Sequence, residues 1–324
     1  MTRVIFMGTP NFSVPILEML IENYNVVGVV TQPDKEVGRK RVLTPSPIKQ
    51  VALKNNIPVL TPRKVRVEYQ EILNLKPDII ITCAYGQIIP KEILNFPKHG
   101  CINVHASLLP EYRGGAPIQR CIMNGEVKTG ITIMYMNEGM DTGDIIDKSE
   151  LIIENNDNYK SLSEKLSSLG TDLLKKVLPN ILSNNITRIK QNEEEATYAH
   201  IIKREDEKLD FNKKSLEIYN HIRGLSDEPG AYAILDGKVV KIYSSRLSDH
   251  VHIGSKNGEI VKIYDDGIGI STADTEIVIT SIKMEGKTRV SVKDYLNGKD
   301  RNRLLGKIFN WGVIWKKKKK RNLN

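Results

Sequence analysis

The stretch Cys101-Ile-Asn-Val-His-Ala-Ser-Leu-Leu-Pro110 begins as an apolar strand and ends in polar side chains and a proline-containing loop. Similar apolar runs, separated by segments with helical periodicity, recur through the first 150 residues, at 4–7, 26–31, 59–60, 78–84 and 102–105. Strands that alternate with helices form βαβ units, in which the strands pair in parallel. The sequence therefore predicts an α/β fold built on a Rossmann-like, mostly parallel sheet.

Asn103 and His105 stand two residues apart at the end of this strand, so their side chains point to the same face. Asp141, in Met140-Asp-Thr-Gly-Asp144, follows another strand-like run at 129–136, and we expect it to meet them at the same sheet edge. Each residue alone is more typical of a loop or turn. Together, an amide donor, an imidazole and a carboxylate suit a reaction that develops an oxyanion and moves a proton. No Ser or Cys is aimed by a base in this motif, which favours direct transfer or hydrolysis.

The composition limits the class of protein. The chain of 324 residues is 40% hydrophobic and is long enough for two folded domains. Its three cysteines, Cys83, Cys101 and Cys121, lack CxxC spacing, which predicts buried free thiols in a reducing compartment. We find no signal-peptide pattern, and no apolar run approaches the roughly 18 residues of a membrane span. We therefore expect a cytoplasmic protein.

The charge is unevenly distributed along the chain. Residues 1–206 carry 25 basic and 24 acidic side chains, whereas residues 207–324 carry 23 and 15. An excess of positive charge suggests a polyanionic partner. Six of the basic residues lie at 316–321, however, where they are equally typical of a solvated tail. Outside that tail, the second half is only mildly basic.

The pattern changes in the second half of the chain. From Gly230 onward, short β-rich runs alternate with turns rich in Gly and Asp, as in a small antiparallel barrel. We predict a catalytic domain at 1–190, a linker at 191–206, a smaller β domain at 207–309 and a basic tail at 310–324.

Several motifs together resemble the folate-dependent formyltransferases, in particular those that act on initiator tRNA. They are Phe6-Met-Gly-Thr-Pro-Asn-Phe12, Thr31-Gln-Pro-Asp34, Asn-x-His-x-Ser-Leu-Leu-Pro, Arg113-Gly-Gly-Ala-Pro-Ile-Gln119 and Asp-Thr-Gly-Asp. The resemblance implies formyl transfer from 10-formyltetrahydrofolate to the amino group of methionyl-initiator tRNA, for translation initiation. It further implies an OB-like β-barrel as the second domain, a monomer and no metal ion.

The resemblance also assigns roles to residues. Asn103 would stabilise the oxyanion, while His105 and Asp141 would handle the proton, with the acceptor left open between them. Phe12 would lie near the methionine side chain, although an aromatic there is also typical of a core. The folate would meet Gly86 and Gln87 and a rigid loop, which consists of Ser107, Leu108, Leu109 and Pro110. A basic loop would contact tRNA phosphates through Arg39, Lys40 and Arg41, although by charge alone that loop is typical of a solvated surface.

One segment departs from the family pattern. Ser226-Asp-Glu-Pro-Gly230 stands where members often carry an Asn-Pro-Trp-Pro-like segment, so the packing that the Trp supplies is missing here.

Four rival functions can be weighed. A dinucleotide-dependent oxidoreductase would need G-x-G-x-x-G after the first strand, where this chain has Gly8-Thr-Pro-Asn-Phe12. An RNA-binding protein without enzymatic activity would leave Asn103, His105 and Asp141 unused. A glycinamide ribonucleotide formyltransferase would need neither the basic loop nor the second domain. A formyltransferase acting on a nucleotide-linked amino sugar shares more of the layout and stays open.

Overall fold

The computed structural model describes residues 2–38, 41–298 and 300–309. Contacts divide the chain into two compact units, Met1–Cys121 with Glu126–Ile201, and Ile122–Gly125 with Ile202–Asn324. Among the described residues, no helix combines the length and apolar character needed to cross a membrane. The predicted limits of the linker and the tail stay predictions, and residues 310–324 lie outside the described part.

The first unit is built around a seven-stranded sheet with the order β5-β2-β1-β6-β7-β8-β9. The first five strands in this order pair in parallel, and β8 and β9 continue the sheet antiparallel. The bounds are β1 Arg3–Gly8, β2 Asn25–Val30, β5 Val59–Leu60, β6 Ile79–Cys83, β7 Cys101–His105, β8 Lys128–Tyr135 and β9 Ile145–Ile152. The predicted α/β fold with a mostly parallel sheet is confirmed.

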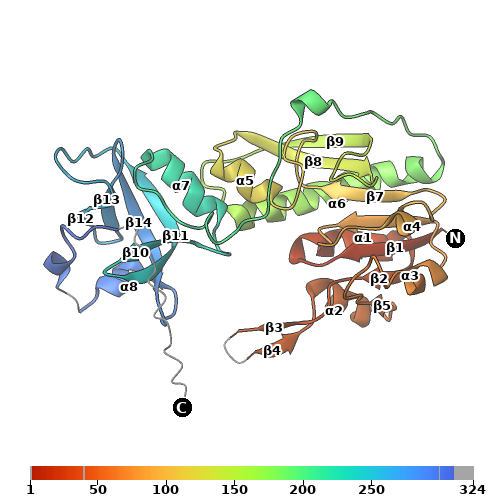
Figure 1. The fold of residues 1–324 in the computed structure, drawn as a ribbon, viewed down its shortest axis with the longest axis horizontal. Coiled ribbons are helices and arrows are strands. Elements are labelled where there is room, and N and C mark those ends of the chain that lie inside the picture. Colours follow the sequence, from red (N-terminus) through yellow and green to blue (C-terminus); the bar gives the residue numbers. More distant parts are fainter. Residues whose placement is uncertain (1, 39–40, 299, 310–324) are drawn as a thin grey trace, which may run out of the picture. The chain divides into compact units, whose positions relative to one another are not determined.

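Helices cover both faces of this sheet (Figure 1). One face packs against α3 and α4, whose buried Ile72 and Ile93 join Ile5 and Ile80 in one apolar cluster. On the other face, α6 packs against α1, β8 and β9. The helices are α1 Val14–Asn23, α2 Pro47–Lys54, α3 Gln70–Asn74, α4 Lys91–Leu94, α5 Pro117–Met123 and α6 Tyr159–Leu182.

The connections between the strands change direction at β1 and β6. The chain passes from β1 outward to β2 and β5, and then returns to β6 on the other side of β1, so the strand order reverses there. In open α/β sheets, ligands bind beyond the carboxyl ends of the strands at such a point. A Cβ on Gly8, at the end of β1, would stand 2.9 Å from the Cys83 carbonyl oxygen, so only glycine fits this edge.

A β-hairpin, not an irregular loop, occupies the basic insertion after β2. Strands β3 Lys35–Val37 and β4 Val42–Thr44 pair antiparallel, and Figure 1 shows them extending from the first unit near α2. The hairpin is anchored at its base by the Lys49 ammonium, 2.8 Å from Asp34. Its apolar side chains Val37, Val42 and Leu43 are more than half exposed.

The second unit contains an antiparallel sheet with the order β10-β11-β14-β13-β12, and β15 pairs with β14. The long strand β11 has register shifts near Ser244, which let it bend along β14. Helix α7 packs on β11 and β14 over a core that includes Ile222, Ile242 and Ile277. The elements are α7 Ser215–Gly224, β10 Ala231–Leu235, β11 Lys238–Ser248, β12 Ile260–Ile263, β13 Ile268–Ser271, β14 Glu276–Met284, β15 Val290–Ser291 and α8 Val292–Leu296. The predicted second β domain is confirmed.

A buried carboxylate joins three parts of the second unit. Glu276 is fully buried and accepts hydrogen bonds from Ser248 Oγ at 2.8 Å, from the Tyr264 hydroxyl, and from the His252 imidazole at 2.8 Å. Burial alone would raise the pKa of Glu276, but the hydrogen bonds outweigh it and hold the pKa below its usual range. Stability therefore depends on this group remaining ionised.

A lysine binds the backbone at the end of the Ser226–Gly230 segment, which lacks the tryptophan of the resembled family pattern. The Lys241 ammonium donates to the carbonyl oxygens of Pro229 at 2.6 Å and Gly230 at 2.8 Å. It also pairs with Glu207 at 2.8 Å. Polar contacts to the backbone thus hold the end of this segment.

Candidate functional site

Asn103, His105 and Asp141 come together at the carboxyl edge of the first sheet. Asn103 and His105 project from β7, and Asp141 lies in the loop that joins β8 to β9. Asp141 Oδ1 is 3.4 Å from Asn103 Nδ2, and its Oδ2 is 3.7 Å from His105 Nδ1. The expected meeting of these three side chains is therefore what the structure shows.

Thr82, on the neighbouring strand β6, orients the Asn103 amide. Thr82 pairs with Asn103 in the sheet, and its hydroxyl donates to Asn103 Oδ1 at 2.9 Å. With the amide oxygen held by this donor, Nδ2 faces Asp141 and the reaction space. Asn103 thus presents N–H groups where a developing negative charge can be stabilised.

A backbone carbonyl fixes the ring orientation of His105. Its Nε2 lies 3.1 Å from the Tyr112 carbonyl oxygen, which can only accept a hydrogen bond. The proton on Nε2 is therefore engaged, and Nδ1 is the nitrogen that faces Asp141 and can exchange a proton. The imidazole is 5% exposed, so water has little direct access to it.

Asp141 is held in an unusual backbone conformation. Its φ is +53°, which is uncommon for a residue other than glycine. The Gly114 N–H donates to Asp141 Oδ2 at 2.8 Å, and the Gln191 side-chain amide donates to the Asp141 carbonyl oxygen at 2.8 Å. These two contacts fix the carboxylate and the backbone of Asp141 independently.

A buried arginine stands behind this arrangement. Arg113 is fully buried, and its guanidinium donates to Gln191 Oε1 at 2.8 and 3.0 Å and to both oxygens of Glu193 at 2.8 Å. The hydrogen bonds from Arg113 lower the pKa of Glu193.

Sequence reasoning did not find Thr82 or Gln191, and it assigned no role to Arg113. Arg113 stands out in the sequence because it opens the Arg113-Gly-Gly motif. Thr82 is a threonine in an apolar strand, and Gln191 is a glutamine in a polar segment. Nothing local distinguishes such residues.

The loop predicted to line a folate cleft is rigid. Thr132 Oγ1 accepts from the Leu109 N–H at 3.0 Å and donates to the Ser107 carbonyl oxygen at 2.7 Å. The Lys148 ammonium donates to the Leu109 carbonyl oxygen at 2.9 Å, and Ser107 Oγ donates to that of Glu111 at 2.6 Å. Leu108 is half-buried and Pro110 follows a cis peptide bond. This loop therefore stands in a defined position directly after His105.

The second predicted folate segment also lies at this sheet edge, directly after β6. Gly86 has a φ of +87°, and a Cβ there would meet only Gln32 Nε2, at 3.5 Å, so the backbone is open to close approach. The Gln87 side chain is engaged by the protein itself, accepting from the Val65 N–H at 2.9 Å and donating to the Pro62 carbonyl oxygen at 3.1 Å. The predicted role of Gly86 and Gln87 in binding folate stays a prediction.

Phe12 lies just beyond β1, at the same edge, and is half-buried rather than part of the core. Of the three basic residues predicted to contact tRNA, Arg39 and Lys40 lie outside the described residues. Arg41 lies in the turn just before the second hairpin strand and is highly exposed, with its guanidinium 3.7 Å from Glu36. The predicted roles of all four residues stay predictions.

The thiols near the site are unreactive. Cys83, Cys101 and Cys121 are free and buried, as predicted. Burial raises the pKa of Cys83, at the end of β6, to about 12, and that of Cys101 to about 12. A thiol with so high a pKa supplies no thiolate at neutral pH, so neither can act as a nucleophile.

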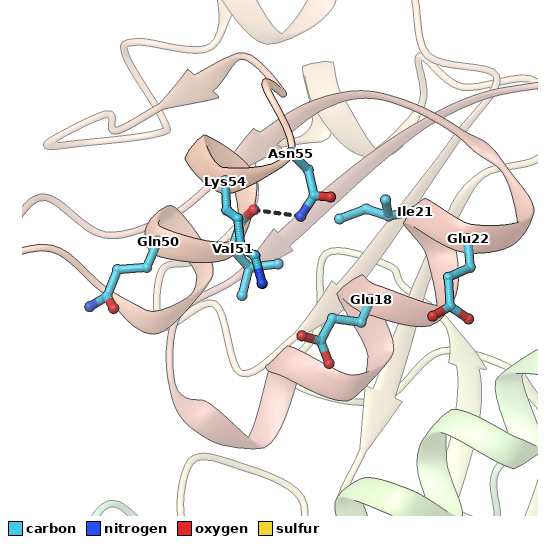
Figure 2. Close-up of a pocket in the computed structure, with 7 residues that line it drawn as sticks. All are labelled: Glu18, Ile21, Glu22, Gln50, Val51, Lys54 and Asn55. Atoms are coloured by element: carbon cyan, nitrogen blue, oxygen red, sulfur yellow. Dashed lines mark hydrogen bonds between the residues drawn. The ribbon is translucent and has the colours of Figure 1, made fainter.

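A separate hollow of about 410 Å³ lies between α1 and α2 (Figure 2). It is lined by Glu18, Ile21, Glu22, Gln50, Val51, Lys54 and Asn55. These residues belong to α1 and α2, with Asn55 directly after α2. Asn103, His105 and Asp141 are not among the residues that line the hollow.

Comparison with known families matches both units. Residues 2–178 match the formyl transferase family model, and residues 201–300 match the model of the formyl transferase C-terminal domain. The first match alone covers more than half of the chain.

Individual relatives agree with these matches. A methionyl-tRNA formyltransferase from Bacillus cereus (strain G9842) is 53% identical over 302 residues, covering 92% of this chain and 96% of the relative. An N-formyltransferase from Helicobacter canadensis, solved in complex with folinic acid and dTDP-3-aminofucose, superposes with a TM-score of 0.66 at 27% identity, covering 86% and 99% of the two chains. A methionyl-tRNA formyltransferase from Clostridium thermocellum shares the fold, with a TM-score of 0.55 at 22% identity and coverage of 76% and 94%.

Proposed function

The chain belongs to the formyl transferase family, and on that premise we propose that it transfers the formyl group of 10-formyltetrahydrofolate to the amino group of methionyl-initiator tRNA, for translation initiation. The observation that carries the proposal is the convergence of Asn103, His105 and Asp141 on one point at the carboxyl edge of the sheet. The identity of 53% over 92% of the chain to a methionyl-tRNA formyltransferase supports this acceptor.

The three side chains supply what amide transfer requires. As the amine adds to the formyl carbon, negative charge develops on the formyl oxygen, and the Asn103 N–H groups stabilise it. The attacking nitrogen must lose a proton, and the leaving nitrogen must gain one. His105 Nδ1 and Asp141 stand side by side to hold or pass that proton, either directly or through one water molecule.

The predicted folate residues fit a planar, amide-rich ligand. The open backbone at Gly86 and the rigid 107–110 loop are both at the sheet edge that carries Asn103. We propose that Gly86 and Gln87 bind the ligand through backbone groups, while Ser107, Leu108, Leu109 and Pro110 line its cleft. When bound, the folate supplies the activated formyl carbon, and these residues position it beside Asn103.

The hairpin supplies the contact with tRNA in this proposal. We propose that Arg39, Lys40 and Arg41 bind phosphates of the acceptor end and that Phe12 contacts the methionine side chain. Phosphate contacts orient a nucleic acid without reading its sequence. The apolar side chains of the hairpin, each more than half exposed, support a binding role.

A nucleotide-linked amino sugar is the second candidate acceptor. The Helicobacter enzyme was solved with such a sugar, and it shares 27% identity with this chain. The identity to the Bacillus enzyme is about twice as high over a similar share of the chain, which favours methionyl-tRNA.

Formyl transfer assays with purified protein test the proposal. The protein is mixed with 10-formyltetrahydrofolate and, separately, methionyl-initiator tRNA or an amino-sugar nucleotide, and the formylated products are quantified. Formyl-methionyl-tRNA as the main product supports the proposal. Formylation of the sugar alone would show that the sugar, and not tRNA, is the acceptor. The proposed role of Asn103 in formyl transfer would then stay unchanged.

A further inference from the structure

We propose that Gln191, itself fixed by buried Arg113, is a positioning residue that sets where the Asp141 carboxylate stands relative to His105. The inference rests on the proposed function, because it assigns Asp141 a part in that reaction. It concerns two residues that lie behind the site and do not touch the reacting atoms.

The first step of the argument is the orientation of the Gln191 amide. Arg113 offers only N–H donors, so the oxygen of Gln191 must face it, at 2.8 and 3.0 Å. The amide nitrogen then points to the opposite side. There it donates to the carbonyl oxygens of Asp141 and Gly143, both at 2.8 Å. All polar groups of this amide are thus matched in one orientation.

The second step is what this amide holds in place. Asp141 has a φ of +53°, and its loop is tight, because a Cβ on Gly143 would stand 1.8 Å from the Tyr135 carbonyl oxygen. A conformation of this kind persists only when its surroundings enforce it. Gln191 donates to the carbonyl oxygens of Asp141 and Gly143, on either side of Thr142, so the loop cannot relax without breaking these two hydrogen bonds.

The third step is that Gln191 is itself anchored. Ile189 exchanges two backbone hydrogen bonds with Ile145, at 2.8 and 2.9 Å, which ties its segment to the start of β9. Arg113 adds the bidentate contact with Glu193, two residues further along the chain. The residue after Arg113 is Gly114, whose N–H binds the Asp141 carboxylate. Arg113 therefore connects both supports of Asp141.

The variant Gln191→Glu separates positioning from simple packing. Glutamate has the same length as glutamine, and one of its oxygens can still accept from Arg113, with which it forms an ion pair. Its second oxygen, however, replaces the N–H donor that faces the carbonyl oxygens of Asp141 and Gly143. If Gln191 only supplied a partner for Arg113, the variant would match the wild type. If Gln191 positions Asp141, kcat should fall about 10- to 100-fold while the KM values stay within a few-fold of the wild type. Wild-type kcat would overturn the proposal.

A matched control and a second readout complete the test. Glu194→Gln is the control, because Glu194 is an exposed neighbour and the change alters charge by the same magnitude. The second readout is the set of NMR resonances of the His105 ring in the substrate-free protein at one fixed pH, assigned with His105→Gln. These resonances should move in Gln191→Glu and not in the control, and unchanged resonances would also overturn the proposal. Because this readout needs no substrate, it stands even if wild-type protein formylates another acceptor.

If Gln191→Glu does not fold, as judged by thermal unfolding, Gln191→Met takes its place in both measurements. It has a similar length and removes both donors without adding charge.

Discussion

Replacing Asp141 with Asn removes the carboxylate that the structure places against the His105 ring. The carboxylate oxygen is 3.7 Å from His105 Nδ1, and both side chains are mostly buried. At an effective dielectric constant of roughly 20, a charge pair at this distance is worth about 4 kcal/mol. If the transition state carries a proton on His105, losing this attraction should lower kcat by roughly 100- to 1000-fold.

The assay is steady-state formyl transfer to methionyl-initiator tRNA, with tRNA binding and thermal unfolding measured on the same protein. Asparagine keeps the shape of the side chain, so we expect the Kd for tRNA to stay near that of the wild type. Gly114 would keep an acceptor only if the new amide turned its N–H groups toward Asn103 Nδ2, which is itself a donor, so a stability loss of about 1–3 kcal/mol is also expected. A kcat within a few-fold of wild type, in a folded variant, would refute the electrostatic role of Asp141.

Three further outcomes are expected. Asn103→Ala should lower kcat about 100- to 1000-fold with little effect on the Kd for tRNA, and a variant with wild-type kcat would remove the oxyanion role. Alanine at all three basic residues of 39–41 should weaken tRNA binding and reduce the slope of log Kd against log salt concentration by up to about 3. An unchanged slope would indicate that these residues belong to a solvated surface loop and do not contact tRNA phosphates. Glu276→Gln should reduce the free energy of unfolding at pH 7 by about 1–3 kcal/mol, whereas exposed Glu285→Gln should not.

The sign of the pH dependence at Glu276 follows from its depressed pKa. The stabilisation is fully present above the ordinary glutamate pKa and is lost as the pH falls through the lower pKa of the folded state. The wild type should therefore lose stability on acidification, and the difference from Glu276→Gln should shrink. A difference that stayed constant between neutral and strongly acidic pH would contradict this explanation.

The sequence was sufficient for features that repeat locally. Apolar strands alternating with helical segments predicted the α/β sheet, and the two-residue spacing of Asn103 and His105 placed both on one face of β7. The β-hairpin at 35–44 was harder to predict from the sequence. Its strands are short and its apolar side chains are exposed, so its sequence pattern does not differ from that of a polar loop.

Periodicity along the chain determined by itself the apolar strands that carry the site and the face that Asn103 and His105 share. It also showed that an amide, an imidazole and a carboxylate are available at the ends of those strands. Only the tertiary structure decided how they are oriented. Thr82 reaches Asn103 from the neighbouring strand, and Gln191 reaches Asp141 across 50 residues. Such contacts depend on how the sheet pairs its strands and where a distant segment returns to it. Local spacing carries no information about either, because a hydrogen bond between residues far apart in the chain leaves no periodic mark in the sequence.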